Sequence, residues 1–235
     1  MEKTVNAADK ERAQEILKIL RVRIPLREED FAASRVAKES GDPFRVLVVT
    51  ILSQNCTDIA ALRAYEILDR SVGVSVSTLS RARVPTIEKA IHVAGLHKQK
   101  AKALKQLARI VNEKYSGNFA EALEGSFEQV RDGLQELPNV GPKTADVLLS
   151  IWDRPTISVD THVDRVSKRL GLAPAKARYR EVRSALMQEF LETDYRSVPL
   201  YFMALGRRVC KAQRPLCPTC PVNNLCPFEG KTKPI

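Results

Sequence analysis

Four cysteines lie close together near the end of the printed sequence, with the spacing C-x6-C-x2-C-x5-C. They are Cys210, Cys217, Cys220 and Cys226. The first residues carry several charges and lack the apolar run of a secretory signal, so we expect a cytoplasmic protein without disulfides. Four thiolates can complete a tetrahedral zinc site or hold an iron–sulfur cluster. One C-x2-C pair with two unequal arms favours the cluster, and zinc stays open.

A lysine stands where a helix could activate it. The segment Leu137–Thr144 reads LPNVGPKT, and we expect a tight turn between two helices, with Pro142 in the first position of the second. Lys143 would follow in the first helical turn, where the positive end of the helix dipole disfavours its charged form and favours a nucleophilic amine. The alternatives are a lysine that only contacts phosphate and a plain turn between helices.

A carboxylate follows 17 residues later. After Pro155, a short extended stretch leads to Asp160, which we expect to cap a helix over Thr161–Leu170. Backbone N–H groups at such a cap keep a carboxylate ionised. Near an amine, it could stabilise positive charge that develops at a sugar carbon or relay a proton. The alternative is that Asp160 is only a cap, and for His162 we expect a structural role.

The composition indicates a polyanionic partner. Lysine and arginine number 38 against 28 acidic residues, a net charge of +10 that is spread along the chain. Free backbone N–H groups at the expected turn suit a phosphate oxygen, so nucleic acid is the best partner. One basic run is expected to be an ordinary solvated helix face: Lys98, Lys100, Lys102 and Lys105. The longest uncharged stretch, Val46–Thr57, is too short to span a membrane.

Apolar periodicity is helical nearly throughout, so we predict an all-α protein. Helices are expected over Ala8–Arg23 and Lys100–Tyr115, and the apolar run Val46–Leu52 is expected to continue into Ile59–Leu68. The lone Cys56 is expected to be a small buried hydrophobic residue.

In their order and spacing, the Leu137–Ala145 turn, the Val159–His162 segment and the four cysteines resemble the endonuclease III family of DNA glycosylases. The resemblance runs from about Pro43 to Cys226. It implies the helix-hairpin-helix DNA glycosylase fold, with two helical lobes and a DNA-binding cleft between them. One lobe, 31–154, would be a six-helix barrel domain with the hairpin. The other, 1–30 and 155–235, would carry the cluster loop. The resemblance also implies a 4Fe-4S cluster on the four cysteines, and a monomer.

The same resemblance implies the chemistry. Lys143 would attack C1′ of a damaged nucleotide that has left the base stack, and Asp160 would assist. A lysine–sugar Schiff base would form and permit β-elimination, so the enzyme would be both glycosylase and abasic-site lyase. The substrate would be double-stranded DNA with a damaged or mismatched base. Oxidised pyrimidine is the family default; uracil, mismatched thymine or 5-methylcytosine would use the same chemistry.

Further DNA contacts are expected. Pro138, Val140 and Gly141 belong to the turn that suits a phosphate oxygen. The resemblance adds Leu96, His97, Gln54, Asn55 and Asp58. Leu96 would be the residue that wedges into the duplex, and His97 stands where relatives often carry tyrosine. Gln54 and Asn55 lie in the segment that fills the gap left by the flipped base, but the family's glutamine aligns with Asn55. Asp58 matches a pocket position and could equally cap the helix Ile59–Leu68.

Two other functions stay open. In a non-catalytic helix-hairpin-helix DNA-binding iron–sulfur protein, Lys143 would be a phosphate contact and Asp160 a cap. An iron–sulfur electron carrier would have no need of the hairpin. The combination of the hairpin, Lys143 and Asp160 favours the enzyme over both.

Overall fold

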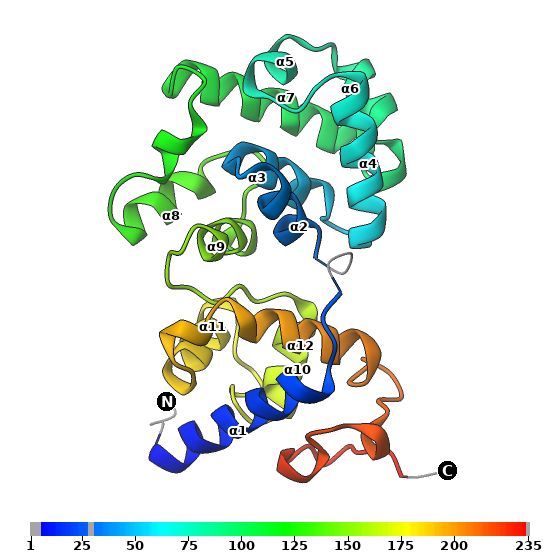
Figure 1. Ribbon diagram of the computed structural model, residues 1–235, viewed down its shortest axis with the longest axis vertical. Helices are drawn as coiled ribbons and strands as arrows, with labels where there is room; N and C mark the ends of the chain where they lie inside the picture. The colour runs from blue at the N-terminus through cyan, green and yellow to red at the C-terminus, as the bar shows by residue number, and fades with distance from the viewer. Residues whose placement is uncertain (1–5, 28–30, 234–235) are drawn as a thin grey trace. The chain divides into compact units, whose positions relative to one another are not determined.

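The computed structural model describes residues 6–27 and 31–233. Every regular element among these residues is an α-helix or a short 3-10 turn, so the predicted all-α fold is confirmed (Figure 1). The chain divides into two compact units. We call Arg27–Arg154 the hairpin unit, and Met1–Leu26 with Pro155–Ile235 the cysteine unit. The sequence predicts a domain over 31–154 that contains the hairpin, whereas the hairpin unit of the structure begins at Arg27.

The hairpin unit contains eight α-helices in its described part. They are α2 (Ala32–Ser40), α3 (Pro43–Leu52), α4 (Asp58–Ser71), α5 (Val76–Arg81), α6 (Val84–Ala90), α7 (His97–Lys114), α8 (Phe127–Gln135) and α9 (Pro142–Ile151). Short 3-10 turns, His92–Ala94 and Phe119–Leu123, precede α7 and α8.

The centre of the hairpin unit is α3. Eight of its ten residues are buried, as expected for a helix that is apolar on all sides. The Asp42 side chain caps its start by accepting from the N–H of Phe44, and Pro43 takes the first turn. Around it pack α2, α4, α7 and α9. The helices that carry the predicted site residues of this unit therefore rest on one core.

The cysteine unit consists of four helices and a C-terminal loop in its described part. The helices are α1 (Ala7–Arg23), α10 (Thr161–Arg169), α11 (Tyr179–Glu189) and α12 (Ser197–Arg208). α12 packs against α10 and α1, and α1 also contacts α11. Two 3-10 turns, Cys217–Thr219 and Asn223–Leu225, lie in the loop. The cysteine unit thus joins the N-terminal helix to the last third of the chain.

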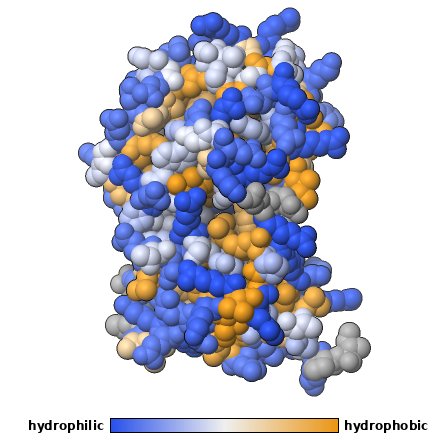
Figure 2. All heavy atoms as spheres, in the orientation of Figure 1, coloured by the Kyte–Doolittle hydropathy of each residue, from blue (hydrophilic) through white to orange (hydrophobic). Residues whose placement is uncertain are grey.

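Hydrophilic residues prevail on the face of the molecule in Figure 2, and apolar residues appear there in scattered patches. None of the helices in the described part of the chain is both long and apolar enough to cross a membrane.

The expectation that Val46–Leu52 continues into Ile59–Leu68 is wrong. α3 ends at Leu52, and the polar residues that follow form a turn in which Asn55 has a positive φ of 55°. Thr57, not Asp58, caps α4, because the Thr57 side chain accepts from the N–H of Ala60. The Asp58 carboxylate instead accepts from the N–H of Ala32, at 3.1 Å, and so serves the first turn of α2.

The expectation of a solvated lysine face on α7 is also wrong in part. Lys98 and Lys102 are exposed, but Lys100 is only 1% exposed and Lys105 is half-buried. Lys105 donates to the carbonyl of Ala82 at 2.6 Å. Charge alone could not reveal these partners, because they lie on other segments of the chain.

Candidate functional site

The turn between α8 and α9 has the form expected from the sequence. The N–H of Val140 donates to the carbonyl of Leu137 at 3.1 Å, and Asn139 has a positive φ of 59°. Gly141 is the N-cap of α9, and Pro142 is its first residue. The N–H groups of a first helical turn have no acceptor within the helix, so those of Lys143 and Thr144 are suited to an anion.

The predicted hairpin residues differ in exposure. Gly141 is exposed and Pro138 half-buried, whereas the side chain of Val140 lies in the core with 4% exposure. Only the backbone of Val140 is therefore placed to contact DNA.

Lys143 lies exposed in the first turn of α9. Lys143 therefore stands at the surface, directly after the turn whose N–H groups are suited to an anion.

A buried ion pair fixes α8 against α9. Arg131 donates from Nε and Nη2 to the two carboxylate oxygens of Asp146, at 2.8 and 3.1 Å. Both side chains are buried. Buried charges need a partner of opposite charge, and the two-point pairing gives each of them one. Sequence reasoning missed this pair, although an aspartate among the apolar residues of α9 signals a buried partner.

The turn after α3 is bound to the hairpin. The Gln54 side-chain amide donates to the carbonyl of Asn139 at 2.8 Å and to the hydroxyl of Thr144 at 3.2 Å. Asn55 is exposed beside it. Of the two residues predicted to reach DNA, Gln54 has its amide engaged by the hairpin, and Asn55 has its side chain at the surface.

The turn before α7 presents a leucine to solvent. Leu96 is 52% exposed and has a left-handed backbone with φ of 47°, next to Gly95 with φ of 64°. A left-handed leucine is strained and persists only where its surroundings hold it. The predicted contact His97 is half-buried, and its ring packs on that of His92 with centroids 4.5 Å apart.

In the cysteine unit, Asp160 is the N-cap of α10, as predicted. Its Oδ1 accepts from the N–H groups of His162 and Val163, at 2.8 and 2.7 Å. Both bonds use the same oxygen, so Oδ2 is the atom of this carboxylate that remains available to a substrate.

His162 has the structural role expected of it. Arg165 Nη2 lies 3.0 Å from its Nδ1 and donates to the carbonyl of Gly206 on α12. A Cβ on Gly206 would lie 2.9 Å from the Cβ of His162, so α10 and α12 can approach this closely only with glycine there. Burial lowers the pKa of His162, which keeps the imidazole neutral near pH 7.

The four predicted cysteine ligands line one small apolar cavity, together with Val166, Leu205 and Phe228. Arg169 encloses it from α10. Its guanidinium lies over the Phe228 ring, 4.7 Å from the centroid, and Nη1 donates to Cys210 Sγ at 3.4 Å. The fifth thiol, Cys56, belongs to the hairpin unit, where it is half-buried against the core.

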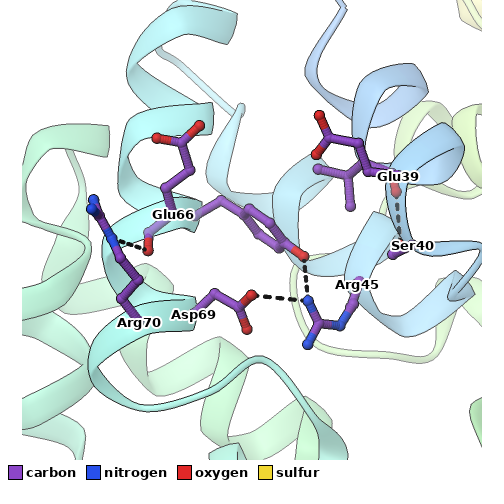
Figure 3. A pocket seen from close by; sticks show the side chains of 8 residues that line it. Glu39, Ser40, Arg45, Glu66, Asp69 and Arg70 are labelled. Atoms are coloured by element: carbon purple, nitrogen blue, oxygen red, sulfur yellow. Dashed lines mark hydrogen bonds and ion pairs between the residues drawn. The ribbon is translucent and has the colours of Figure 1, made fainter.

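A separate surface pocket of about 360 Å³ lies between α2, α3 and α4 (Figure 3). Arg45 donates there to Tyr65 Oη at 3.1 Å and to Asp69 at 3.0 Å. Its lining contains none of the predicted site residues. Arg45 and Asp69 pair within it, and its two glutamates, Glu39 and Glu66, pair with Arg35. We therefore assign it to the packing of these helices.

Comparison with known proteins places the chain among DNA repair enzymes. Residues 48–191 match the model of the HhH-GPD superfamily base excision DNA repair proteins. The chain is 30% identical to the endonuclease III of Sulfolobus acidocaldarius over 92% of its own length and 96% of the relative's. It is 35% identical to that of Bacillus subtilis, over 82% of this chain and 84% of the relative.

Solved structures agree. A trapped endonuclease III–DNA covalent intermediate is similar to this chain with a TM-score of 0.70 and 31% identity, over 86% of this chain and 97% of that one. A thermostable thymine-DNA glycosylase has a TM-score of 0.75 over 95% of this chain and 98% of that one, but at 22% identity it shows the fold alone.

Proposed function

The chain belongs to the endonuclease III family of base excision DNA repair proteins, and from this premise we propose that it is a DNA glycosylase and abasic-site lyase with Lys143 as its nucleophile. The observation that carries the proposal is the exposed amine in the first turn of α9, directly after a turn suited to phosphate. A relative of 31% identity forms a covalent intermediate with DNA, which requires a nucleophile on the protein.

The steps follow from an amine and a sugar. The neutral amine of Lys143 attacks C1′, the glycosidic bond breaks, and the base leaves with the bonding electrons and takes up a proton. The attached amine loses a proton, the C1′–O4′ bond breaks while O4′ takes up a proton, and a C1′=N Schiff base forms. A proton is then removed from C2′, and the 3′ phosphate leaves by β-elimination. Water finally hydrolyses the imine and frees the lysine.

We assign the assisting role to Asp160. The α10 cap holds this carboxylate in place through two N–H donors on Oδ1. A fixed negative charge stabilises the positive charge that develops at C1′ as the base departs, and it costs no reorganisation at that moment.

Oxidised pyrimidine in double-stranded DNA is the proposed substrate. Uracil, mismatched thymine and 5-methylcytosine would pass through the same lysine chemistry, so the nucleophile does not select among them. Selection falls to residues that touch the flipped base and its partner. Among those of the hairpin unit, Asn55 and Leu96 are exposed. The Asp58 carboxylate accepts a hydrogen bond at the start of α2, and the His97 ring packs on that of His92. Both side chains therefore contact other residues of the hairpin unit.

We propose that the four cysteines hold a 4Fe-4S cluster. All four cysteines line one cavity in the described part of the cysteine unit. The resemblance to the endonuclease III family favours a cluster of four irons over a single zinc ion there. When bound, the cluster would order the loop between Cys210 and Cys226; iron and sulfide analysis of the purified protein tests this.

The proposed enzyme acts in the cytoplasm as a monomer. Lys143→Ala tests its chemistry on a duplex with thymine glycol. We expect strand cleavage to be lost while DNA affinity stays within about tenfold, because one phosphate-range contact contributes on the order of 1–2 kcal/mol. Lys102→Ala, which removes an exposed lysine from α7, is the matched control and should cleave normally. Cleavage by Lys143→Ala at the wild-type rate would show that the nucleophile is another residue.

A further inference from the structure

We propose that Lys100 is a positioning residue of the DNA interface, which joins the turn carrying Leu96 to the turn carrying Asn55 so that both meet DNA as one rigid unit. This inference rests on the proposed function. It concerns three turns of the hairpin unit and a side chain that does not itself reach the surface.

Lys100 makes three hydrogen bonds from a buried position. Its side chain is 1% exposed, and Nζ donates to the carbonyl oxygens of Leu52, Gln54 and Ala94 at 2.8, 2.7 and 2.8 Å. Burial lowers the pKa of this lysine. Only the charged form has three N–H donors, so these three acceptors are satisfied together only by the ammonium ion. Without the ammonium group, the carbonyls of Gln54 and Ala94 would lose this donor, whereas that of Leu52 would keep the Cys56 thiol at 3.0 Å.

The three carbonyl groups come from two separate turns. Leu52 is the last residue of α3, and Gln54 directly precedes Asn55, whose φ is 55°. Ala94 ends a 3-10 turn, two residues before Leu96, whose φ is 47°. Each turn therefore exposes a residue other than glycine in the left-handed region. Such conformations are kept only where the surrounding structure determines them, and Lys100 is the shared contact of both turns.

The connection extends to the hairpin. Gln54 accepts from Lys100 with its backbone carbonyl, and its side-chain amide donates to Asn139 and Thr144. Thr144 follows the proposed nucleophile, Lys143. A continuous set of hydrogen bonds thus runs from the Leu96 turn through Lys100 and Gln54 to the first turn of α9.

This arrangement meets a requirement of base extrusion. A wedge residue can separate a base from its neighbours only if its own turn is rigid. The residue that fills the space left by the base must lie at a fixed distance from the wedge residue. If the two turns were free to move, their ordering would oppose DNA binding. Through Lys100 the two turns are ordered during folding, before DNA arrives.

The test uses Lys100→Met, which keeps the length of the side chain and removes its charge and donors. Lys105→Met is the matched control, because Lys105 lies on the same helix and bonds one carbonyl, that of Ala82, away from both turns. Single-turnover base removal is measured together with the fluorescence of 2-aminopurine placed beside the lesion, which reports extrusion. We expect Lys100→Met to slow base removal about tenfold or more and to reduce the fluorescence rise, and Lys105→Met to stay within about twofold of wild type.

A double-mutant cycle separates positioning from general stability. If Lys100 acts through Leu96, adding Lys100→Met to the Leu96→Ala variant should slow base removal by less than about threefold. The same substitution in the wild-type protein should slow base removal by its full factor. If the two substitutions slow base removal independently, so that their factors multiply in the double variant, the proposal is overturned. A normal fluorescence rise in a folded Lys100→Met variant would also overturn it. If the melting curve shows that Lys100→Met is unfolded, Lys100→Gln, a shorter neutral donor, takes its place under the same criteria.

Failure of this inference is distinguishable from failure of the proposed function. Wild-type protein that forms no covalent adduct with abasic DNA would contradict the enzyme itself. An adduct in wild type, with unchanged extrusion in the Lys100 variants, would contradict only the role of Lys100.

Discussion

At the scale of single residues, the proposed chemistry depends on two side chains that differ in exposure and in hydrogen bonding. Lys143 is exposed at the start of α9, where it can reach a substrate, and Asp160 is held by two backbone donors at the start of α10. Helix N-termini stabilise negative charge and disfavour positive charge. Both side chains therefore belong to helix N-termini, Lys143 beside N–H groups that are suited to a phosphate and Asp160 as the acceptor of two such N–H groups.

Asp160→Asn separates charge from capping. The asparagine oxygen can still accept from the N–H groups of His162 and Val163, so we expect a melting temperature close to that of wild type. Base removal should fall about 100-fold, in the range of losses when a positioned charge or base is removed. Asp160→Ala, which also loses the cap, should cost about 1 kcal/mol of stability in addition. Unchanged base removal by Asp160→Asn would show that the residue is only a cap.

His162 gives a pH dependence of stability. Burial lowers its pKa below the ordinary 6.5. Above that pH the imidazole is neutral in both states. As the pH falls below it, the unfolded chain binds the proton first, so stability is lost toward the lower folded pKa. Melting temperatures of wild type and His162→Gln, measured from about pH 7.5 to 5, should show the steeper decline in wild type. Parallel curves would contradict this.

At the scale of elements, the hairpin is set by contacts on both sides of its turn. Arg131 on α8 and Asp146 on α9 form a buried two-point ion pair, and Gln54 binds the turn from the end of α3. The turn itself contains proline and glycine where its backbone needs them. Local sequence thus shapes the turn, and contacts distant in sequence hold it in place.

Arg131→Met should destabilise the hairpin unit by about 3–5 kcal/mol, because it removes the two-point guanidinium pairing from the buried Asp146 carboxylate. Adding Asp146→Leu removes the stranded charge and should recover much of the loss. Urea unfolding of both variants measures this. A single variant as stable as wild type, or a double variant less stable than the single, would show that the pair does not hold α8 on α9.

The sequence predicted those features that depend on neighbours along the chain. Pro142 begins α9 and Asp160 caps α10 because turn and cap preferences are local. The end of α3 at Leu52 was not expected. The helix is ended by the polar turn that follows it, and the apolar residues before the turn give no sign of that end. Nor was the burial of Lys100 expected, because its three carbonyl partners come from other segments. Periodicity identifies the helix of a charged residue but not its partners.

At the scale of the whole molecule, each unit supplies one of the two proposed catalytic groups. Lys143 belongs to the hairpin unit and Asp160 to the cysteine unit. The chain passes from one unit to the other at Leu26–Arg27 and at Arg154–Pro155, so the two proposed groups lie on either side of the second crossing in the sequence. The net charge of +10 draws the protein to the DNA backbone irrespective of sequence, which leaves recognition of the lesion to the residues that meet the extruded base.

Borohydride trapping detects the proposed Schiff base itself, because borohydride reduces a lysine–sugar imine to a stable amine. The duplexes contain thymine glycol, uracil, mismatched thymine, 5-methylcytosine or a bare abasic site. The proteins are wild type, Lys143→Ala and the control Lys102→Ala. We expect a covalent protein–DNA adduct with wild type and the control and none with Lys143→Ala, and the strongest adduct among the base-containing duplexes identifies the lesion. An adduct that persists in Lys143→Ala, or no wild-type adduct even with abasic DNA, would contradict the lysine mechanism.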